Sequence, residues 1–262
     1  MGLVCTTAVL LPSLPGAMPP LPERPYPGPD TAAWERPDPI YAPAQATPAT
    51  SRPADATGPS EGDLYLQTLA PEVRETLLRD RVYLIAGEDP DSPSAEGSGP
   101  AAAIKGYIRA LALFNRPKER TLELMLEPGK LAWFLDDLYD SEAVARDPDL
   151  GELTRFTIKF LWIDVSFWVQ HWFYPEISRY EWYIDTENFR NGIRDNRGYW
   201  QLYALDDERT IGEYGIVVDT GIPIPRSWVE RIQRRRIPGA MAQFHRYIDS
   251  DGAYRKPRWR GN

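Results

Sequence analysis

Strict alternation of apolar and polar residues marks the middle of the chain. Between Ile104 and Phe114, small or apolar side chains occupy every second position, while Lys105 and Arg109 belong to the other face. The same period returns from Thr154 to Asp164. One face of that second range carries Phe156, Ile158, Phe160 and Trp162. A period of two residues is typical of a strand with one buried face, so we expect strands over both ranges.

Five shorter segments have the same character. They are rich in aromatic and β-branched residues and are separated by turn-forming residues, as strands of a sheet usually are. These segments are Arg81 to Ala86, Phe167 to Tyr174, Ile177 to Ile184, Gly198 to Leu205 and Thr210 to Asp219. Because short connections join most of them in order, we expect them to pair as an antiparallel sheet.

Helical spacing of apolar residues begins after Pro225. The stripe consists of Trp228, Ile232, Ala240, Phe244 and Ile248. One face of this long helix should therefore lie on the sheet. Pro238, inside the pattern, lacks an amide donor and clashes with the carbonyl group of Arg234, which predicts a kink.

Shorter helices are expected before the sheet and within it. One covers Glu72 to Leu78. Another follows Asn115 and Pro117, because an asparagine side chain caps free amides and a proline suits the first turn of a helix. The apolar spacing of Lys130 to Leu138 predicts a third.

Composition separates the two ends of the chain from its middle. The first 60 residues contain 14 of the 26 prolines and show no apolar period. Such a segment buries too little apolar surface to offset its chain entropy, so residues 1–62 are expected to be a disordered, Pro/Ala-rich arm. Residues 63–250 are then one domain, large enough for a single core. Residues 251–262 are expected to be a basic, flexible tail.

Charge bears on the choice of partner. The chain has a net charge of −8, which argues against nucleic acid as a partner because phosphate binding requires a basic face. The C-terminal part is nevertheless rich in cations. They are Arg226, Arg231, Arg234, Arg235, Arg236, Arg246, Arg255, Lys256, Arg258 and Arg260. Two readings stay open for them, a solvated helix face or peripheral contact with an anionic membrane.

Residues suited to metal binding are scarce. Cys5 is the single cysteine, and His171 and His245 are the only histidines. No spaced set of Asp, Glu and His residues resembles a zinc or iron site, so we expect neither a metal nor another cofactor. Both histidines are interpreted as surface groups or as satisfied groups of the core.

The extreme N-terminus gives little information on cellular location. Val4 to Met18 is mildly apolar, but Pro12 and Pro15 interrupt it and no basic residue precedes it. It is too short to span a bilayer and lacks the charged start of an export signal. A cytoplasmic location is favoured, while export through a signal upstream of the assigned start stays open.

Several of these segments together resemble one superfamily. The resemblance rests on the strand 104–114, Asn115-Arg116-Pro117, Tyr180-Glu181-Trp182, Gly198-Tyr199-Trp200-Gln201-Leu202, Asp207-Glu208-Arg209-Thr210 and the helix from Pro225 to Ile248. Over roughly residues 80–250 the chain resembles the START-like (SRPBCC) superfamily, which includes Bet v 1 relatives, polyketide cyclase-like proteins and coenzyme-Q-binding proteins of the Coq10 type.

This resemblance implies an α+β helix-grip fold. In that fold a curved, seven-stranded antiparallel sheet wraps around a long C-terminal helix, and the cavity between them holds sterols, lipids, quinones or polyketides. No set of catalytic residues is common to the superfamily, so none is assigned. From the apolar pattern, the residues expected to line the cavity are Phe156, Ile158, Phe160, Trp162, Trp168, Trp182, Trp200, Tyr214, Trp228, Ile232 and Phe244. The alternative is that these side chains simply fill the core.

Three functions remain open at this stage. The preferred one is noncatalytic binding or transfer of a hydrophobic small molecule or lipid, because the sequence offers bulky apolar walls and no reactive centre. The second is an enzyme of the polyketide cyclase or aromatase type, a lyase that would use buried carboxylates or tyrosines. Candidates for that chemistry are Asp164, Glu181, Tyr183 and Asp185. The third is a protein-interaction module. The sequence identifies neither the ligand nor the oligomeric state.

Overall fold

The computed structural model describes residues 58–86, 106–147, 151–160, 163–186, 188–219, 221 and 226–257. Five helices and eight strands are described, together with the short 3-10 turns η2 (Pro128–Lys130) and η3 (Pro175–Ile177). The helices are α1 (Glu61–Thr68), α2 (Pro71–Asp80), α3 (Lys118–Met125), α4 (Leu131–Phe134) and α5 (Arg226–Asp249). The strands are β1 (Val82–Ala86), β2 (Gly106–Phe114), β3 (Leu138–Asp147), β4 (Gly151–Phe160), β5 (Ile163–Tyr174), β6 (Arg179–Ile184), β7 (Asp195–Ala204) and β8 (Thr210–Asp219).

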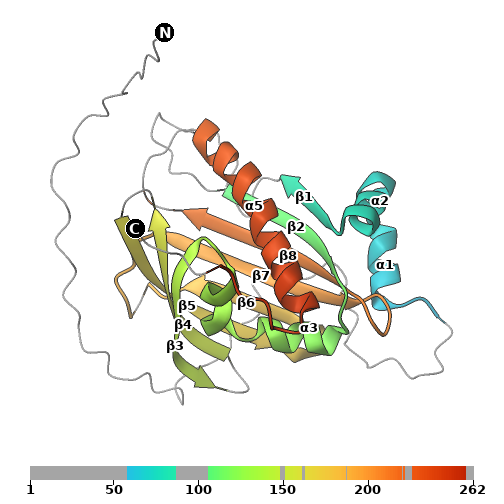
Figure 1. Ribbon diagram of the computed structural model, residues 1–262, viewed down its shortest axis with the longest axis horizontal. Coiled ribbons are helices and arrows are strands. Elements are labelled where there is room, and N and C mark those ends of the chain that lie inside the picture. Colours follow the sequence, from blue (N-terminus) through green and yellow to red (C-terminus); the bar gives the residue numbers. More distant parts are fainter. Residues whose placement is uncertain are drawn as a thin grey trace, which may run out of the picture.

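All eight strands belong to one sheet with the order β1-β2-β8-β7-β6-β5-β4-β3. Every neighbouring pair is antiparallel. Strands β3 to β8 follow one another as a meander, whereas β2 pairs with β8, the last strand of the chain. Helix α5 crosses one face of the sheet and packs on β1, β2 and α4 (Figure 1). The predicted α+β arrangement of a curved antiparallel sheet with a long C-terminal helix is confirmed.

The seven predicted strands are all present, with shifts of a few residues at their ends. The sheet has an eighth strand, β3, which the sequence did not predict and which begins at Leu138, the last residue of the helix predicted over Lys130 to Leu138. That helix is limited to the single turn α4. The proposed cap of the preceding helix is also wrong, because Pro117 is the N-cap of α3 and no side chain caps it. The backbone amide of Asn115 instead donates to Asp249 Oδ1, 2.9 Å away at the end of α5.

We call the face of the sheet beneath α5 the inner face. Alternation along each strand gives this face a large buried cluster of apolar side chains, which α3, α4 and the second half of α5 complete. The cluster includes Ala112, Phe114, Phe156, Val169, Trp182, Trp200, Met241, Phe244 and Ile248. The long helix therefore holds the sheet through the C-terminal part of its predicted stripe.

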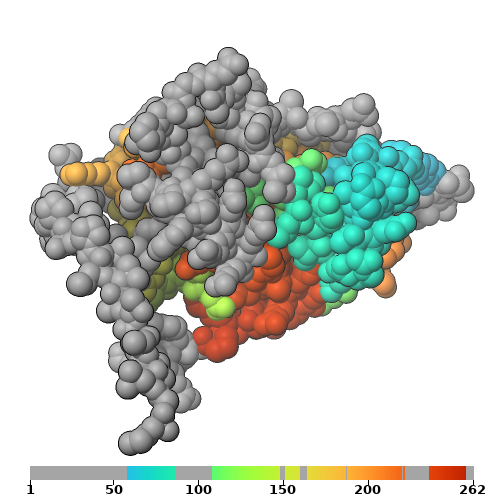
Figure 2. Space-filling view, turned by 90° about the horizontal axis from the view of Figure 1, so that it is seen from above, coloured from blue at the N-terminus to red at the C-terminus, as the bar shows by residue number. Residues whose placement is uncertain are grey.

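The opposite, outer face carries a second, smaller cluster. Helices α1 and α2 lie here, and they bury the side chains Leu66, Leu77, Leu111, Leu113, Leu205 and Ile211. Figure 2 shows the blue-to-cyan segment that contains α1, α2 and β1 at one end of the molecule, next to the red helix α5. The sequence predicted α2 but not α1. Helix α1 starts at a capping box. The Ser60 amide donates to the Asp63 carboxylate and the Asp63 amide donates to the Ser60 hydroxyl, and both hydrogen bonds are 3.0 Å long.

A buried polar network fixes α1 to the outer face. The carboxylate of Glu213 on β8 accepts hydrogen bonds from Tyr65 on α1 (2.5 Å), Tyr199 on β7 (2.7 Å) and Arg109 on β2 (2.8 Å). Burial alone would raise the pKa of Glu213, but its hydrogen bond with Arg109 and the positive charge of that guanidinium outweigh burial and hold the pKa below its usual range. The Tyr65 ring also stacks on Tyr203 with ring centroids 4.1 Å apart.

Close backbone contact at Gly62 brings α1 against the turn after β7. A Cβ atom on Gly62 would lie 2.7 Å from Leu205 Cα and 3.0 Å from the carbonyl oxygen of Ala204. We expect Gly62→Ala to destabilise the protein by about 1–3 kcal/mol, because steric strain exceeds the roughly 1 kcal/mol of helix propensity that alanine gains. Urea unfolding measures this change. The exposed Gln67→Ala in the same helix is the control, and equal stabilisation by both variants would contradict the predicted contact.

The segment after α5 is docked on the domain, although the sequence predicted a flexible tail from residue 251. The Lys256 ammonium donates to the carbonyl groups of Leu135 (2.8 Å) and Leu138 (2.6 Å), and burial lowers its pKa. The guanidinium of Arg255 lies 4.5 Å from the centroid of the Trp133 ring. Arg255 and Lys256 therefore pack on α4 and the residues after it, and Asp251 pairs with Arg120 of α3, so the prediction is corrected for this part of the tail. Residues 258–262 lie outside the described ranges.

Pro238 lies inside the continuous helix α5, where its position was predicted to produce a kink. The kink remains a prediction. The arginine-rich first half of α5 has a described backbone, but its side chains before residue 236 are outside the described set. Arg236 forms an ion pair with Asp137 at 2.9 Å. None of the helices in the described ranges has both the length and the apolar composition needed to cross a bilayer.

Candidate functional site

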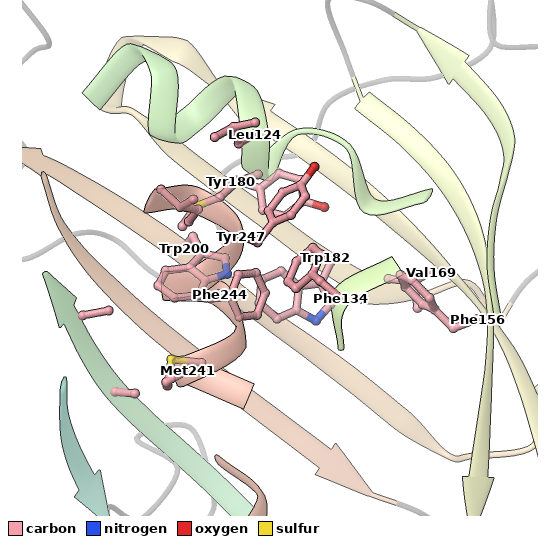
Figure 3. Close-up of a cluster of buried hydrophobic side chains, with 14 of the residues drawn as sticks. Leu124, Phe134, Phe156, Val169, Tyr180, Trp182, Trp200, Met241, Phe244 and Tyr247 are labelled. Atoms are coloured by element: carbon pink, nitrogen blue, oxygen red, sulfur yellow. The ribbon is translucent and has the colours of Figure 1, made fainter. Parts of the chain in front are cut away.

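The inner face holds most of the described residues that the sequence assigned to a cavity. Phe156, Trp182, Trp200 and Phe244 are buried in one cluster, and Ile158 and Tyr214 are partly buried against it. Figure 3 shows Trp200 of β7 next to Phe244 of α5, with Phe156 and Val169 to one side on β4 and β5. The predicted common face of these residues agrees with the sheet register, in which Phe156 pairs with Phe167.

The other predicted cavity residues differ in their positions. Trp168 pairs with Arg155 and lies on the outer face, where its ring stacks on Phe189 with centroids 4.9 Å apart. It is therefore removed from the inner-face set. Both faces of β5 are aromatic, so composition alone did not separate them. Trp162 lies outside the described residues, as do the side chains of Phe160, Trp228 and Ile232.

Aromatic rings beneath α5 form a continuous group around Trp200. The Trp200 ring lies 4.8 Å from Tyr214, 5.3 Å from Phe244 and 5.9 Å from Phe114, measured between centroids. Gly198 leaves room for the neighbouring indole, because a Cβ atom there would lie 2.4 Å from the Trp182 ring. Tilted and edge-to-face pairs of this kind contribute about 0.5–1.5 kcal/mol each beyond area burial. This part of the inner face is a well-packed core.

A buried polar pair interrupts the apolar surface on β5 and β6. The hydroxyl of Tyr180 lies 2.5 Å from His171 Nδ1, and the two rings stack at 5.4 Å. His171 is only 3% exposed, and burial lowers its pKa to about 3. Burial also raises the pKa of Tyr180 well above its usual value. Both groups are therefore uncharged at neutral pH.

Glu152 adds a carboxyl group to the same face. It pairs with His171 across β4 and β5, and its Oε1 accepts hydrogen bonds from the Gly129 amide (3.0 Å) and the Thr154 hydroxyl (2.9 Å). Desolvation raises the pKa of Glu152 despite these two bonds. Its Oε2 lies 3.8 Å from Arg146 Nε, a long ion pair that links the buried group to the surface.

That arginine lines a surface pocket of about 480 Å³ between α3, η2, β3 and the segment after α5. The wall is mostly charged and carries both signs. It is formed by Arg120, Glu123, Leu124, Leu126, Glu127, Lys130, Arg146, Tyr247, Asp251, Gly252 and Arg255. Several of the charges are already paired, such as Arg120 with Asp251 at 2.6 Å. The pocket thus places a polar, charged wall next to the buried carboxyl group of Glu152.

The sequence missed this arrangement, because it interpreted His171 as a surface or satisfied core group and did not single out Glu152 or Tyr180. A usable signal was present. His171 shares the odd positions of β5 with Phe167 and Val169, and Tyr180 shares the even positions of β6 with Trp182, so strand parity brings them to one face. Only the register of the β5–β6 pair, which depends on η3, decides that the two side chains meet.

The four residues suggested for enzyme chemistry are not gathered at this place. Asp164 is exposed, and Asp185 accepts hydrogen bonds from Asn188. Glu181 belongs to the outer face with Tyr183 and is paired with Arg179 at 2.5 Å. They therefore do not form an acid–base set on the inner face.

His245, the second histidine, lies on α5 at the opposite edge of the sheet. Its ring meets Phe114 edge-on with centroids 5.1 Å apart. Burial lowers its pKa to about 4, and the neighbouring Arg81 acts in the same direction. Arg81 in turn pairs with Asp249 at 2.7 Å, which ties the end of α5 to the start of β1. His245 is part of this structural contact.

Comparison with known proteins gives similarities of fold. No protein-family model and no curated protein matches the sequence. Among solved structures, the Zhui aromatase/cyclase from Streptomyces sp. R1128 is 12% identical with a TM-score of 0.46, over 58% of this chain and 100% of that one. A START superfamily protein from Mycobacterium smegmatis is 10% identical with a TM-score of 0.47, over 55% and 97%.

A STAR-related lipid transfer protein from Xanthomonas axonopodis is 15% identical with a TM-score of 0.47, over 63% of this chain and 98% of that chain. The order of the strands and the position of α5 on the inner face agree independently with the superfamily resemblance of the sequence. The chain has an α+β helix-grip architecture, in which one antiparallel sheet packs against a long C-terminal helix.

Proposed function

We propose that this protein binds or transfers a hydrophobic small molecule or lipid, without catalysis, at the inner face of its sheet. The observation that carries the proposal is the extent of the apolar inner face. It continues from the packed group of Trp200 and Phe244 to Phe156 on β4 and Val169 on β5, to one side of that group (Figure 3). An apolar wall with a few placed polar groups is the usual composition of a small-molecule site.

The polar groups around this wall suit an amphipathic ligand. His171 and Tyr180 supply uncharged hydrogen-bonding atoms among the apolar residues. The charged pocket lies on the far side of Glu152, joined to it by Arg146. A ligand with an apolar body and a polar end would find both environments within one region of the fold.

Native mass spectrometry of the full chain, followed by organic extraction, tests this proposal. We expect a bound hydrophobic compound at near-stoichiometric occupancy. Two neighbouring substitutions on β4 give a matched pair, since Ile158 faces inward and Thr157 outward. Ile158→Trp should fill space at the inner face and reduce occupancy at least tenfold, while Thr157→Trp should leave it unchanged.

Thermal unfolding of both variants separates a lost site from a lost fold. An empty wild-type protein that also fails to bind a hydrophobic fluorescent probe, 1-anilinonaphthalene-8-sulfonate, would overturn the proposal. The aromatic residues would then be core alone, and the protein-interaction hypothesis would take precedence.

A further inference from the structure

The imidazole of His171 has one ring nitrogen engaged and one that is not. Nδ1 lies 2.5 Å from the Tyr180 hydroxyl. Nε2 is buried and has no hydrogen-bond partner within the described ranges. The ring itself is 3% exposed and is flanked by Phe156, which meets it edge-on with centroids 5.8 Å apart. A polar atom is thus placed at an otherwise apolar position of the inner face.

The hydrogen on the imidazole can be assigned from its partner. A phenol is a good donor and a poor acceptor, and burial keeps the Tyr180 hydroxyl protonated, so this hydroxyl donates to Nδ1. A neutral imidazole carries one N–H group, and its protonated form is disfavoured here because burial lowers the pKa to about 3. The hydrogen therefore resides on Nε2. His171 Nε2 is therefore a hydrogen-bond donor without an acceptor in the described part of the chain.

Among the described residues, none accepts a hydrogen bond from this nitrogen. Glu152, the cross-strand neighbour, directs Oε1 to Gly129 and Thr154, and Oε2 lies on the side of Arg146. A buried N–H group without an acceptor destabilises the protein, so a bound acceptor oxygen would recover that free energy. The acceptor should be uncharged, because the site is desolvated and already contains the Glu152 carboxyl group.

We infer that His171 Nε2, held in its donor form by Tyr180, is a recognition point for the carbonyl oxygen of a ketone, quinone or ester group on an apolar ligand. This inference rests on the proposed function and narrows its ligand class. Tyr180 acts as a positioning residue, since it fixes the tautomer of His171 without touching the ligand.

A matched pair of probes tests it on the full chain. Fluorenone and fluorene have nearly the same shape and differ in one carbonyl group. We expect the wild-type protein to bind fluorenone about tenfold more tightly, which corresponds to about 1.4 kcal/mol for one added hydrogen bond. His171→Phe should remove this preference, because it weakens the binding of fluorenone and leaves the binding of fluorene unchanged. His171→Gln keeps an amide donor and should restore part of the preference.

Nitrogen-15 NMR of the histidine side chains gives a second readout that needs no ligand. We expect the His171 Nε2–H tautomer in the wild-type protein and a mixture of tautomers in Tyr180→Phe. A proton on Nδ1 in the wild-type protein would overturn the inference. Equal binding of both probes would also overturn it while leaving the proposed function in place, with water as the partner of Nε2. If neither probe binds, the proposed function fails for this class of compounds, and the inference falls with it.

Discussion

Replacing Glu213 by alanine is expected to destabilise the protein by about 3–5 kcal/mol, because the change leaves the partly buried Arg109 guanidinium without its carboxylate. Two tyrosine hydroxyl groups, from Tyr65 and Tyr199, lose their acceptor at the same time. The loss also removes the connection between α1 and β8. Urea unfolding should show a lower midpoint, and limited proteolysis should cut within α1 before the sheet unfolds.

Three further variants separate the contribution of the Glu213 charge to stability from that of the other hydrogen bonds in the network. Glu213→Gln keeps one acceptor oxygen and should cost less than the alanine variant. Tyr65→Phe removes the hydroxyl that donates to Glu213 and accepts from Arg109 Nη2 over 3.3 Å, and it keeps the charge pair, so we expect a loss of about 1–2 kcal/mol. The exposed Glu208→Ala, in the turn between β7 and β8, should change the stability by less than about 0.5 kcal/mol. A loss below 1 kcal/mol in Glu213→Ala would show that the network does not hold α1 in place.

Acid should destabilise the protein before its carboxylates titrate. His171 and His245 have folded-state pKa values of about 3 and about 4, against 6.5 in an unfolded chain. Between the folded-state and unfolded-state pKa values, the unfolded chain binds more protons than the folded protein. The contribution of each neutral histidine to stability is therefore complete above pH 6.5 and is lost as the pH falls below it. The slope is up to about 1.4 kcal/mol per pH unit per site. We expect a combined loss of about 2–4 kcal/mol between pH 6.5 and pH 4.5.

Substitution isolates this effect from the other titrating groups. Glu213 and Asp251 have lowered pKa values, so their contribution to stability is lost mainly below pH 4.5. Glu152 has a raised pKa, so above pH 4.5 its ionisation makes the protein less stable as the pH rises. Urea unfolding of the wild-type protein and of His171→Phe and His245→Phe should therefore be compared from pH 4.5 to pH 7.5. Each variant should show a shallower dependence on pH than the wild-type protein. Parallel profiles would contradict a buried neutral histidine.

Alternation of side chains predicted the strands that have one apolar face, and β8 was predicted at its observed bounds. Strand β3 escaped prediction because it lies at the edge of the sheet, where alternation is weak. Its residues Leu138–Asp147 are half-buried or exposed, several of them small or charged, and its register against β4 shifts twice. Edge strands often have such composition, which limits pairing with other chains. Tertiary contact with β4, rather than local pattern, makes this segment a strand.

Helix α1 was missed for a different reason. Ser60 and Asp63 have the spacing of a capping box, but the proline-rich composition before them concealed it. The tail after α5 was misjudged because its arginines and lysine suggested solvation, whereas Lys256 is fixed by carbonyl groups from a segment more than 100 residues earlier. Contacts between distant segments of this kind leave no local signal.

The sequence predicted several of the aromatic residues that lie on the inner face, but it did not predict the polar pair among them. Parity along β4, β6, β7 and α5 correctly grouped Phe156, Trp182, Trp200 and Phe244. The polar pair of His171 and Tyr180 depends on the register across η3, which a single sequence does not specify. A cavity lined by these aromatic residues stays a prediction, to be decided by what the protein binds.

The pairing of β2 with β8 has a consequence for the way this chain folds. Phe114 pairs with Thr210, so β2 and β8 join only after nearly one hundred intervening residues have been arranged. Pairing over such sequence distances slows folding, because loop closure costs entropy before the contacts form. During synthesis on the ribosome, β2 must wait for β8 with an unpaired edge. Intermediates with that edge open are the states in which this protein is most exposed to aggregation and to chaperones.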